Sequence, residues 1–388
     1  MTELEPHKRT KVYSYWIDIV GTCNLRCPTC PTGNYGQSGP GDERNPTGFM
    51  DLELYRQILK KIRADDISDR TEIHLYNWGE PLMHPKVAEF VAATKAAGFY
   101  CGLSSNFNLE KNIKDIVKAG PDFFRVSLSG FYQQTYAQTH RRGDIRMVKS
   151  NMYRLRHYMD MLDKPFFVQT LYHVYRHNAG DDLTMIVKLC EELGFNLNLV
   201  WAFFMPAEKA VACLNGRCTD EDRKTIDMLA IGLEEAAALS MPHKDMDCSL
   251  RRAQTSINFD GTVQLCCATY ERAHIIAPSF LDVDHNELQR RKYANPMCGP
   301  CMDSGVHALY TYAAGAEFDR VGNEALARAG SPYRMSQFSE PNLALRQGTS
   351  DAAIALPRMA QPKKNRGLRR VKNRLKELAR RYAAVFRQ

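Results

Sequence analysis

The chain has 388 residues, of which 44% are hydrophobic and 25% are charged, a composition typical of globular proteins. No apolar run is long enough to span a membrane, and the polar start MTELEPHKRTK does not resemble a signal peptide. The net charge of +8 comes from residues 361–388, which carry eleven Lys and Arg and one acid, so the rest is near neutral. The basicity therefore does not indicate nucleic-acid binding, and we expect no nucleic-acid partner.

The chain holds twelve cysteines, most of them clustered. Because no signal peptide is evident, we expect a cytoplasmic protein, in which thiols stay reduced. Clustered cysteines in such a protein indicate metal ligands sooner than disulfides.

Short apolar runs rich in β-branched and aromatic residues alternate with helix-like segments over residues 1–210. These runs predict six strands, at 13–20, 71–78, 99–106, 123–130, 165–175 and 196–204. The segments between them, such as DLELYRQILKKI and HPKVAEFVAATKAAG, have the apolar spacing of helices. This alternation predicts an α/β fold, a parallel sheet forming a partial (β/α)6 TIM-like barrel, with its chemistry at the carboxyl ends of the strands.

Three cysteines, Cys23, Cys27 and Cys30, follow the first predicted strand in the stretch CNLRCPTC. Three thiolates do not close a tetrahedral zinc site, and no histidine lies among them. They do supply three of the four ligands that a [4Fe–4S] cluster requires. The loop therefore predicts a cluster with one iron left open for another ligand, and a partial zinc site or a chance spacing is the alternative.

The stretch CNLRCPTC resembles the cluster loop of the radical S-adenosylmethionine (SAM) enzymes, and the resemblance extends over residues 1–210. It implies that the open iron binds SAM and that an electron from the cluster breaks a C–S bond of SAM. The resulting 5′-deoxyadenosyl radical then removes a substrate hydrogen. The resemblance also implies an electron donor of the flavodoxin or ferredoxin type. Thr29 stands where the family often has an aromatic residue.

Later stretches resemble the cofactor-binding motifs of the same family, in order along the chain. YNWGEPLMHP resembles the Gly-Glu motif, with Trp78 in place of the commoner glycine. The resemblance implies SAM contacts from Gly79, Glu80, Ser105, Asn106, Ser127, Ser129 and, within HRRGD, Arg142. Arg142 suits the cofactor carboxylate, with Arg141 as the alternative. Taken singly, such residues are also common at helix starts and turns.

A second set of cysteines lies between residues 211 and 310. INFDGTVQLC predicts a β-hairpin with its turn at Asp260 and Gly261, which would bring two cysteines together. With the later pair, the set is Cys248, Cys266, Cys298 and Cys301. Four thiolates fit either a closed zinc site or a [4Fe–4S] cluster. Cys267 is the alternative to Cys266, because neighbours in a strand point to opposite faces.

This arrangement resembles the auxiliary-cluster extension called SPASM or, in its shorter form, twitch. The resemblance implies that residues 211–310 form a small auxiliary domain holding a second [4Fe–4S] cluster. No cysteine follows Cys301, so the one-cluster form fits better than a complete SPASM domain. Structural zinc remains the alternative.

The last part of the chain is expected to lie outside the chemistry. Residues 311–360 lack a clear periodicity and predict a loosely structured connector. Residues 361–388 predict a basic amphipathic helix, whose narrow apolar stripe suits contact with an anionic membrane surface. A partner helix or a solvated end is the alternative.

Together these features predict an enzyme that abstracts hydrogen from a small-molecule, sugar-like or glycan-precursor substrate. A closed auxiliary cluster favours net oxidation, while epimerisation needs a thiol that returns a hydrogen. The spare cysteines are Cys101, Cys190, Cys213, Cys218 and Cys267. We expect Cys101 and Cys190 to be buried, and Cys213 and Cys218 to be free thiols of a loop. The alternatives are a peptide maturase and a non-catalytic metal-binding module.

Overall fold

A computed structural model describes residues 10–34, 47–336 and 343–345. All the described residues belong to the first of the two units into which the chain divides, Met1–Asp351. The predicted basic tail at 361–388 and the end of the predicted connector lie outside the described residues. Among the helices of the described part, none is long and apolar enough to cross a membrane.

The first unit is built on a nine-stranded sheet. Its strands are β1 (Thr10–Ile17), β2 (Ser68–His74), β3 (Tyr100–Ser105), β4 (Phe123–Leu128), β5 (Phe167–Val174), β6 (Asn196–Trp201), β7 (Gln254–Ile257), β8 (Val263–Gln264) and β9 (Ile275–Ala277). Their order across the sheet is β6-β5-β4-β3-β2-β1-β7-β8-β9. The strands from β6 to β7 run parallel, while β8 and β9 are antiparallel to their neighbours. The six predicted strands and the partial, unclosed barrel are thus confirmed.

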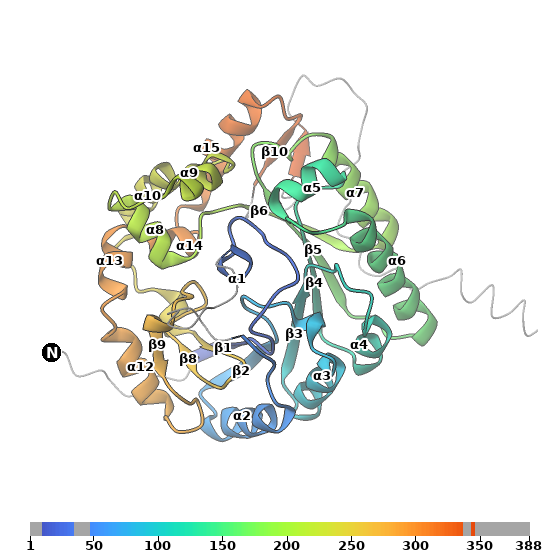
Figure 1. Cartoon of the computed structure of the whole chain (residues 1–388), viewed down its shortest axis with the longest axis vertical. Coiled ribbons are helices and arrows are strands. Elements are labelled where there is room, and N and C mark those ends of the chain that lie inside the picture. Colours follow the sequence, from blue (N-terminus) through green and yellow to red (C-terminus); the bar gives the residue numbers. More distant parts are fainter. Residues whose placement is uncertain (1–9, 35–46, 337–342, 346–388) are drawn as a thin grey trace, which may run out of the picture. The chain divides into compact units, whose positions relative to one another are not determined.

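Helices follow the strands and cover the outer side of the sheet (Figure 1). They are α2 (Leu52–Asp65), α3 (Val87–Ala96), α4 (Ile113–Ala119), α5 (Gln133–Thr139), α6 (Ile145–Leu162) and α7 (Asp181–Leu193). Two short elements, α1 (Pro31–Asn34) and the 3-10 helix η1 (Pro81–Met83), lie in the loops after β1 and β2. Because the parallel strands all end at the same edge, these loops meet there.

Helix α2 shows how local sequence fixes these elements. The carboxylate of Asp51 accepts hydrogen bonds from the backbone N–H groups of Glu53 and Leu54 and so caps the helix. Apolar residues at helical spacing, including Tyr55 and Ile58, are fully buried on the face of the helix that packs against the sheet. A capped, amphipathic segment of this kind is visible in sequence alone.

The later part of the chain is mainly helical. Its elements are α8 (Ala207–Leu214), α9 (Asp220–Asp227), α10 (Leu233–Ser240), η2 (Met241–His243), α11 (Ser249–Arg252), η3 (Arg272–His274), α12 (His285–Tyr293), α13 (Cys298–Asp303), α14 (Val306–Tyr310) and α15 (Gly315–Arg328). Strands β10 (Tyr333–Met335) and β11 (Leu343–Leu345) form a separate antiparallel pair.

The prediction of a loose connector at 311–360 is wrong over residues 315–328. They form α15, which buries Phe318, Val321 and Leu326. Trp201 packs against Gly322, where a Cβ atom would lie 2.5 Å from the indole ring. Small residues lower the apolar contrast of this helix, and therefore its periodicity is hard to recognise from sequence.

The predicted hairpin is present, and it extends the core sheet. β7 and β8 pair antiparallel around a turn in which Gly261 has a φ of 84°. The carboxylate of Asp260 accepts hydrogen bonds from the backbone N–H and the hydroxyl of Thr262. On its other side β7 pairs parallel with β1, so the second cysteine region is attached directly to the first strand of the barrel.

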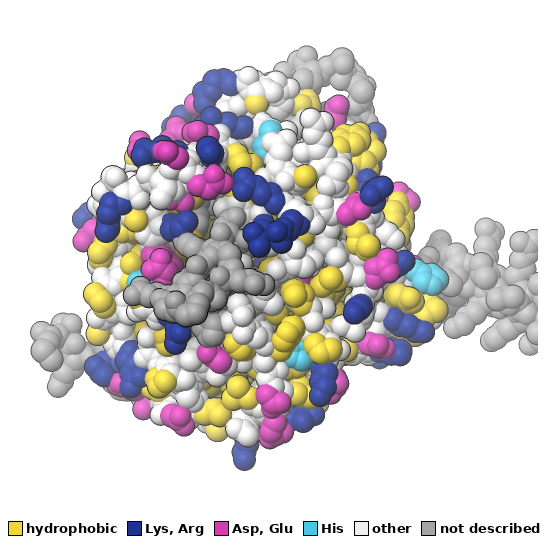
Figure 2. Space-filling view, viewed as in Figure 1, with side chains coloured by type: hydrophobic (Ala, Val, Ile, Leu, Met, Phe, Trp, Pro, Cys, Tyr) yellow, Lys and Arg dark blue, Asp and Glu magenta, His cyan; other side chains and the backbone are white. Residues whose placement is uncertain are grey.

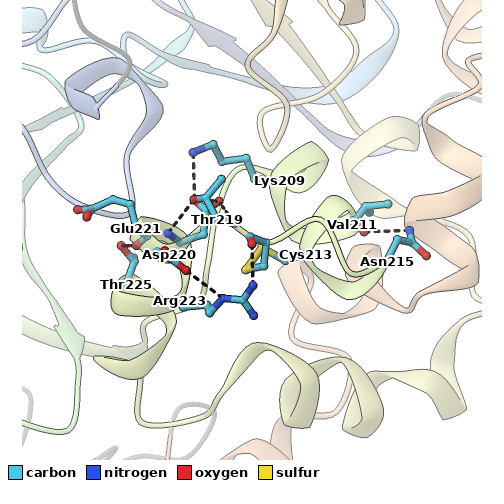
Figure 3. Close-up of a disulfide and its surroundings, with 11 residues drawn as sticks. Lys209, Val211, Cys213, Asn215, Thr219, Asp220, Glu221, Arg223 and Thr225 are labelled. Carbon is cyan, nitrogen blue, oxygen red and sulfur yellow. Dashed lines mark hydrogen bonds and ion pairs between the residues drawn. A yellow bond between two sulfur atoms is a disulfide. The ribbon is translucent and has the colours of Figure 1, made fainter.

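Cys213 and Cys218 form a disulfide, so the prediction that they are free thiols is wrong (Figure 3). Gly216, with a φ of 77°, reverses the chain just after α8 and brings the two Cα atoms to 4.1 Å. The guanidinium of Arg223 donates to the carbonyl of Cys218, which holds the start of α9 against this loop. The expectation that these thiols stay reduced rested on a cytoplasmic location and did not consider a turn that brings the two cysteines together.

Candidate functional site

The three-cysteine loop occupies the carboxyl edge of the sheet, between β1 and α1 near the centre of the view in Figure 1. Burial raises the pKa of Cys23 and Cys27, and each thiol is close enough to Cys30 for the two negative charges to repel. The amide of Asn106 donates to Cys23 Sγ at 3.6 Å. The loop therefore gathers three soft ligands, held from the end of β3, as a cluster with one open iron requires.

The position of Thr29 has a simple structural explanation. Tyr175, just beyond β5, is buried, hydrogen-bonds to the Thr29 side chain and lies beside the thiols of Cys27 and Cys30. An aromatic ring is thus present next to the loop, supplied by a distant strand.

Asp18 holds the Gly-Glu loop in place, a role that the sequence prediction missed. Its carboxylate accepts hydrogen bonds from the backbone N–H groups of Asn77, Trp78 and Gly79, at 2.8–3.0 Å. Burial raises the pKa of Asp18 to about 6, although the three N–H donors act in the opposite direction. The signal that could have revealed it is an acidic residue in the apolar run WIDIV.

Glu80 joins the ends of β2 and β3. One carboxylate oxygen accepts from the N–H of Leu82 and the hydroxyl of Ser105, and the other accepts from the N–H of Asn106 at 2.8 Å. The side chain is 3% exposed, and burial raises its pKa to about 7. A carboxylate has about four acceptor sites, so one further donor, such as an ammonium group, fits here.

We expect the change of Gly79 to Ala to disrupt this loop. A Cβ atom at position 79 would lie 1.6 Å from the carbonyl oxygen of Val20, so the backbone would have to move. The expected loss is about 3 kcal/mol or more in the free energy of unfolding, measured by chemical denaturation. Gly232→Ala is the control, because no atom lies within 4 Å of its added Cβ. Equal stability of the two variants would contradict the packing role of Gly79.

The other predicted cofactor contacts, Ser127, Ser129 and Arg142, differ from one another in burial and in hydrogen-bond partners. Ser129 is buried, and its hydroxyl has no hydrogen-bond partner among the described residues, so it is available to a ligand. Ser127 lies at the same end of β4. Arg142 is exposed in a left-handed conformation, with a φ of 72°, and Arg141 pairs with Glu221 at 3.4 Å. The backbone carbonyl of Arg141 accepts a hydrogen bond from the N–H of Arg26, within the cysteine loop, at 3.0 Å. Neither arginine side chain forms a hydrogen bond to this loop among the described residues.

The second cysteine set converges on one cavity, where about 440 Å³ of space, open solvent included, holds no protein atom. Its wall includes all four predicted residues, Cys248, Cys266, Cys298 and Cys301. Cys248 precedes α11, Cys266 follows β8, and the last two lie three residues apart on α13. Burial raises the pKa of all four thiols, and that of Cys301 to about 12. Four soft donors around an unfilled space fit a fully ligated metal centre.

Cys266 and Cys267 differ in what they face. Both follow the end of β8, so the reasoning from strand alternation does not apply to them. Cys266 lines the cavity with the other three thiols. The Cys267 thiol instead hydrogen-bonds the side chain of Gln254 and lies near the hydroxyl of Tyr76.

A polar group lies near Cys267, which adjoins the second cysteine set. Tyr76 packs edge-on against Trp16, with ring centroids 5.1 Å apart, and the Arg125 guanidinium lies 5.8 Å from the Tyr76 ring. Arg125 lies on β4, and Tyr76 follows β2, so β3 separates them. The Arg125 side chain can extend across β3 because the residues of β3 at this point, Gly102 and Ser104, are small. The Tyr76 hydroxyl is buried and has no hydrogen-bond partner in the described part of the chain.

The two cysteine regions are also joined directly. The indole N–H of Trp78 donates to the carbonyl oxygen of Thr269 at 3.1 Å, and its ring packs edge-on against Tyr270. Trp78 thus connects the Gly-Glu loop to the segment that follows Cys266, a connection that a glycine there could not make.

A partial parallel barrel with three cysteines in the loop after its first strand defines a class of proteins that bind an iron–sulfur cluster. Residues 17–178 match the family model of the Radical SAM superfamily. The matched residues thus form a radical SAM domain, which covers about two fifths of the chain. A domain of this kind implies a [4Fe–4S] cluster and SAM as cofactors.

Individual relatives share only part of their length with the chain. The tungsten-containing aldehyde ferredoxin oxidoreductase cofactor-modifying protein of Pyrococcus furiosus is 30% identical over 181 residues, 46% of this chain and 39% of that protein. The S-adenosyl-L-methionine-dependent 2-deoxy-scyllo-inosamine dehydrogenase of Niallia circulans is 26% identical over 115 residues, 29% of this chain and 42% of that protein. The matched regions thus span about two fifths of each relative. The solved structure of Streptococcus suis SuiB bound to S-adenosylmethionine has a TM-score of 0.47 at 13% identity, covering 75% of this chain and 67% of that one.

Proposed function

We propose that this protein cleaves SAM reductively and oxidises a carbon that bears a hydroxyl group in a polar, sugar-like small molecule. The observation that carries the proposal is the single cavity lined by Cys248, Cys266, Cys298 and Cys301. Four thiolates fill every protein-ligand position of a cubane cluster, so such a centre suits electron transfer better than substrate binding. An electron acceptor next to the barrel favours loss of two electrons from the substrate over return of a hydrogen.

The proposed roles of the core residues follow from their contacts. Cys23, Cys27 and Cys30 would hold the first [4Fe–4S] cluster, which supplies the electron that breaks the C–S bond of SAM. Glu80, Ser105 and Asn106 form one hydrogen-bonded group beside Cys23, which suits the amino end of the cofactor. Ser127, Ser129 and Arg142 remain proposed contacts for the rest of SAM.

The proposed substrate class rests on the polar group of Tyr76 and Arg125 near Cys267. The Tyr76 hydroxyl lacks a protein partner among the described residues and is therefore expected to bond a substrate hydroxyl. The Nε of Arg125 donates to the side-chain oxygen of Gln169 at 3.2 Å, and Arg125 forms no ion pair within the described residues. The Niallia circulans relative, by its name, is a dehydrogenase of 2-deoxy-scyllo-inosamine, a name consistent with this class.

The reaction is tested by following hydrogen from candidate substrates. With an aminocyclitol or sugar deuterated at its carbinol carbons, the reduced holoenzyme is expected to give deuterated 5′-deoxyadenosine and a ketone in equal amounts. Mass spectrometry measures both products. Deuterated 5′-deoxyadenosine without any oxidised product would contradict the proposed oxidation.

A second candidate function, epimerisation, is favoured by Cys267. Its thiol does not line the four-cysteine cavity and lies near Tyr76, where it could return a hydrogen atom to a substrate radical. In deuterated water, epimerisation would place deuterium at a stable carbon of an unoxidised product. The same deuterium transfer should then be absent from Cys267→Ala.

A further inference from the structure

Lys292 is a completely buried lysine in α12, with 0% of its surface exposed. Its Nζ donates to the backbone carbonyls of Gln254, at 2.6 Å, and Arg251, at 3.4 Å. It also donates to the hydroxyls of Tyr13 and Thr255, at 3.2 Å each. All four acceptors are uncharged. Nothing in the described part of the chain pairs a carboxylate with Lys292, so its ammonium charge is not balanced by an acidic side chain.

Such an arrangement is unusual, because a buried ammonium group is costly unless a negative charge lies nearby. Other lysines of this chain have a carboxylate partner, as Lys95 has Asp122 and Lys118 has Asp115. Neutral oxygens satisfy the N–H groups of Lys292 and fix their position, but they do not cancel its charge.

The groups next to Lys292 that become negative on binding a metal are cysteines of the four-cysteine cavity. The backbone carbonyl of Lys292 accepts a hydrogen bond from Cys298 Sγ at 3.5 Å. Burial lowers the pKa of Lys292 to about 7, and the thiolate form of Cys266 is near enough to the ammonium group to act in the opposite direction. Arg251, whose carbonyl accepts from Lys292, also lines the cavity. The backbone of Lys292 thus contacts one proposed ligand, Cys298, and its ammonium group lies near a second, Cys266.

We propose that Lys292 is the fixed counter-charge of the auxiliary metal centre and raises its reduction potential, an inference that rests on the proposed function. A cubane held by four thiolates is negatively charged, and reduction adds one more negative charge. A positive charge in a poorly screened position stabilises the more negative, reduced form. Lys292 thereby makes the centre a better electron acceptor. It acts through the cluster as a positioning residue and does not touch the substrate.

The test compares reduction potentials within one protein. Lys292→Met removes the charge while keeping a side chain of similar length. The clusters of the reconstituted full chain are followed by EPR spectroscopy during a redox titration. The auxiliary cluster is expected to shift to a more negative midpoint potential, while the core cluster, as internal reference, stays unchanged. In Lys292→Arg, which keeps the positive charge, the midpoint potential of the auxiliary cluster is expected to stay close to that of the unmodified protein. Lys118→Met, the same change at an exposed lysine on α4, should move neither potential.

The outcomes separate this inference from the proposed function. An unchanged auxiliary potential in Lys292→Met, with the iron content of both clusters retained, overturns the counter-charge role alone. Loss of the auxiliary cluster from Lys292→Met but not from Lys292→Arg supports it, whereas loss from both means that packing and not charge matters. Zinc in place of a second cluster in the unmodified protein overturns the proposed function itself.

Discussion

Replacement of Cys23, Cys27 and Cys30 together by Ala is expected to lower 5′-deoxyadenosine formation to the level of a sample without enzyme. The three thiols lie in one loop, and each interacts with another of the set, so no ligand set for the core cluster would remain. The readout is 5′-deoxyadenosine after anaerobic reconstitution and reduction with SAM present. The fold should persist, because the loop lies outside the strands of the sheet.

Cys190→Ala provides a matched control for that experiment. Cys190 is 2% exposed in α7 and lies outside both cysteine sets, so its change tests the general effect of losing a buried thiol. We expect cofactor cleavage to continue in Cys190→Ala. Formation of 5′-deoxyadenosine by the triple variant would contradict the assignment of the core cluster.

Much of the fold was accessible from sequence because its signals are local. The six strands of the barrel alternate with amphipathic helices such as α2, and both patterns are readable within short windows. The cysteine sets were equally visible, since CNLRCPTC and the later pair at Cys298 and Cys301 are compact motifs. Burial of Cys101 and Cys190 is also confirmed.

The remaining features depend on contacts between distant parts of the chain. Lys292 meets Tyr13 across 279 positions, and β7 pairs with β1 although more than half of the chain separates them. Asp18 accepts hydrogen bonds from backbone N–H groups about sixty residues away. Because every residue but proline has such an N–H group, no sequence motif marks these contacts. The disulfide between Cys213 and Cys218 is local, but it depends on the left-handed turn at Gly216, which the composition does not reveal.

The choice between Cys266 and Cys267 illustrates the same limit and leads to a sharp test. Adjacent residues of the same type cannot be told apart by motif, yet only Cys266 of the two lines the four-cysteine cavity in the described part of the chain. The unmodified protein is expected to contain about eight irons, four from each cubane.

We expect Cys266→Ala to retain about four irons per chain, those of the core cluster, and to form 5′-deoxyadenosine without oxidised product. Cys267→Ala, changed at the neighbouring position, should keep about eight, because its thiol bonds Gln254 outside the cavity. Iron and acid-labile sulfide analysis, with product analysis on the same samples, measures each effect. If Cys267→Ala loses half of its iron and Cys266→Ala does not, the ligand is Cys267. If both variants keep all of their iron, neither thiol holds the second cluster, and the electron acceptor on which oxidation depends must be sought elsewhere.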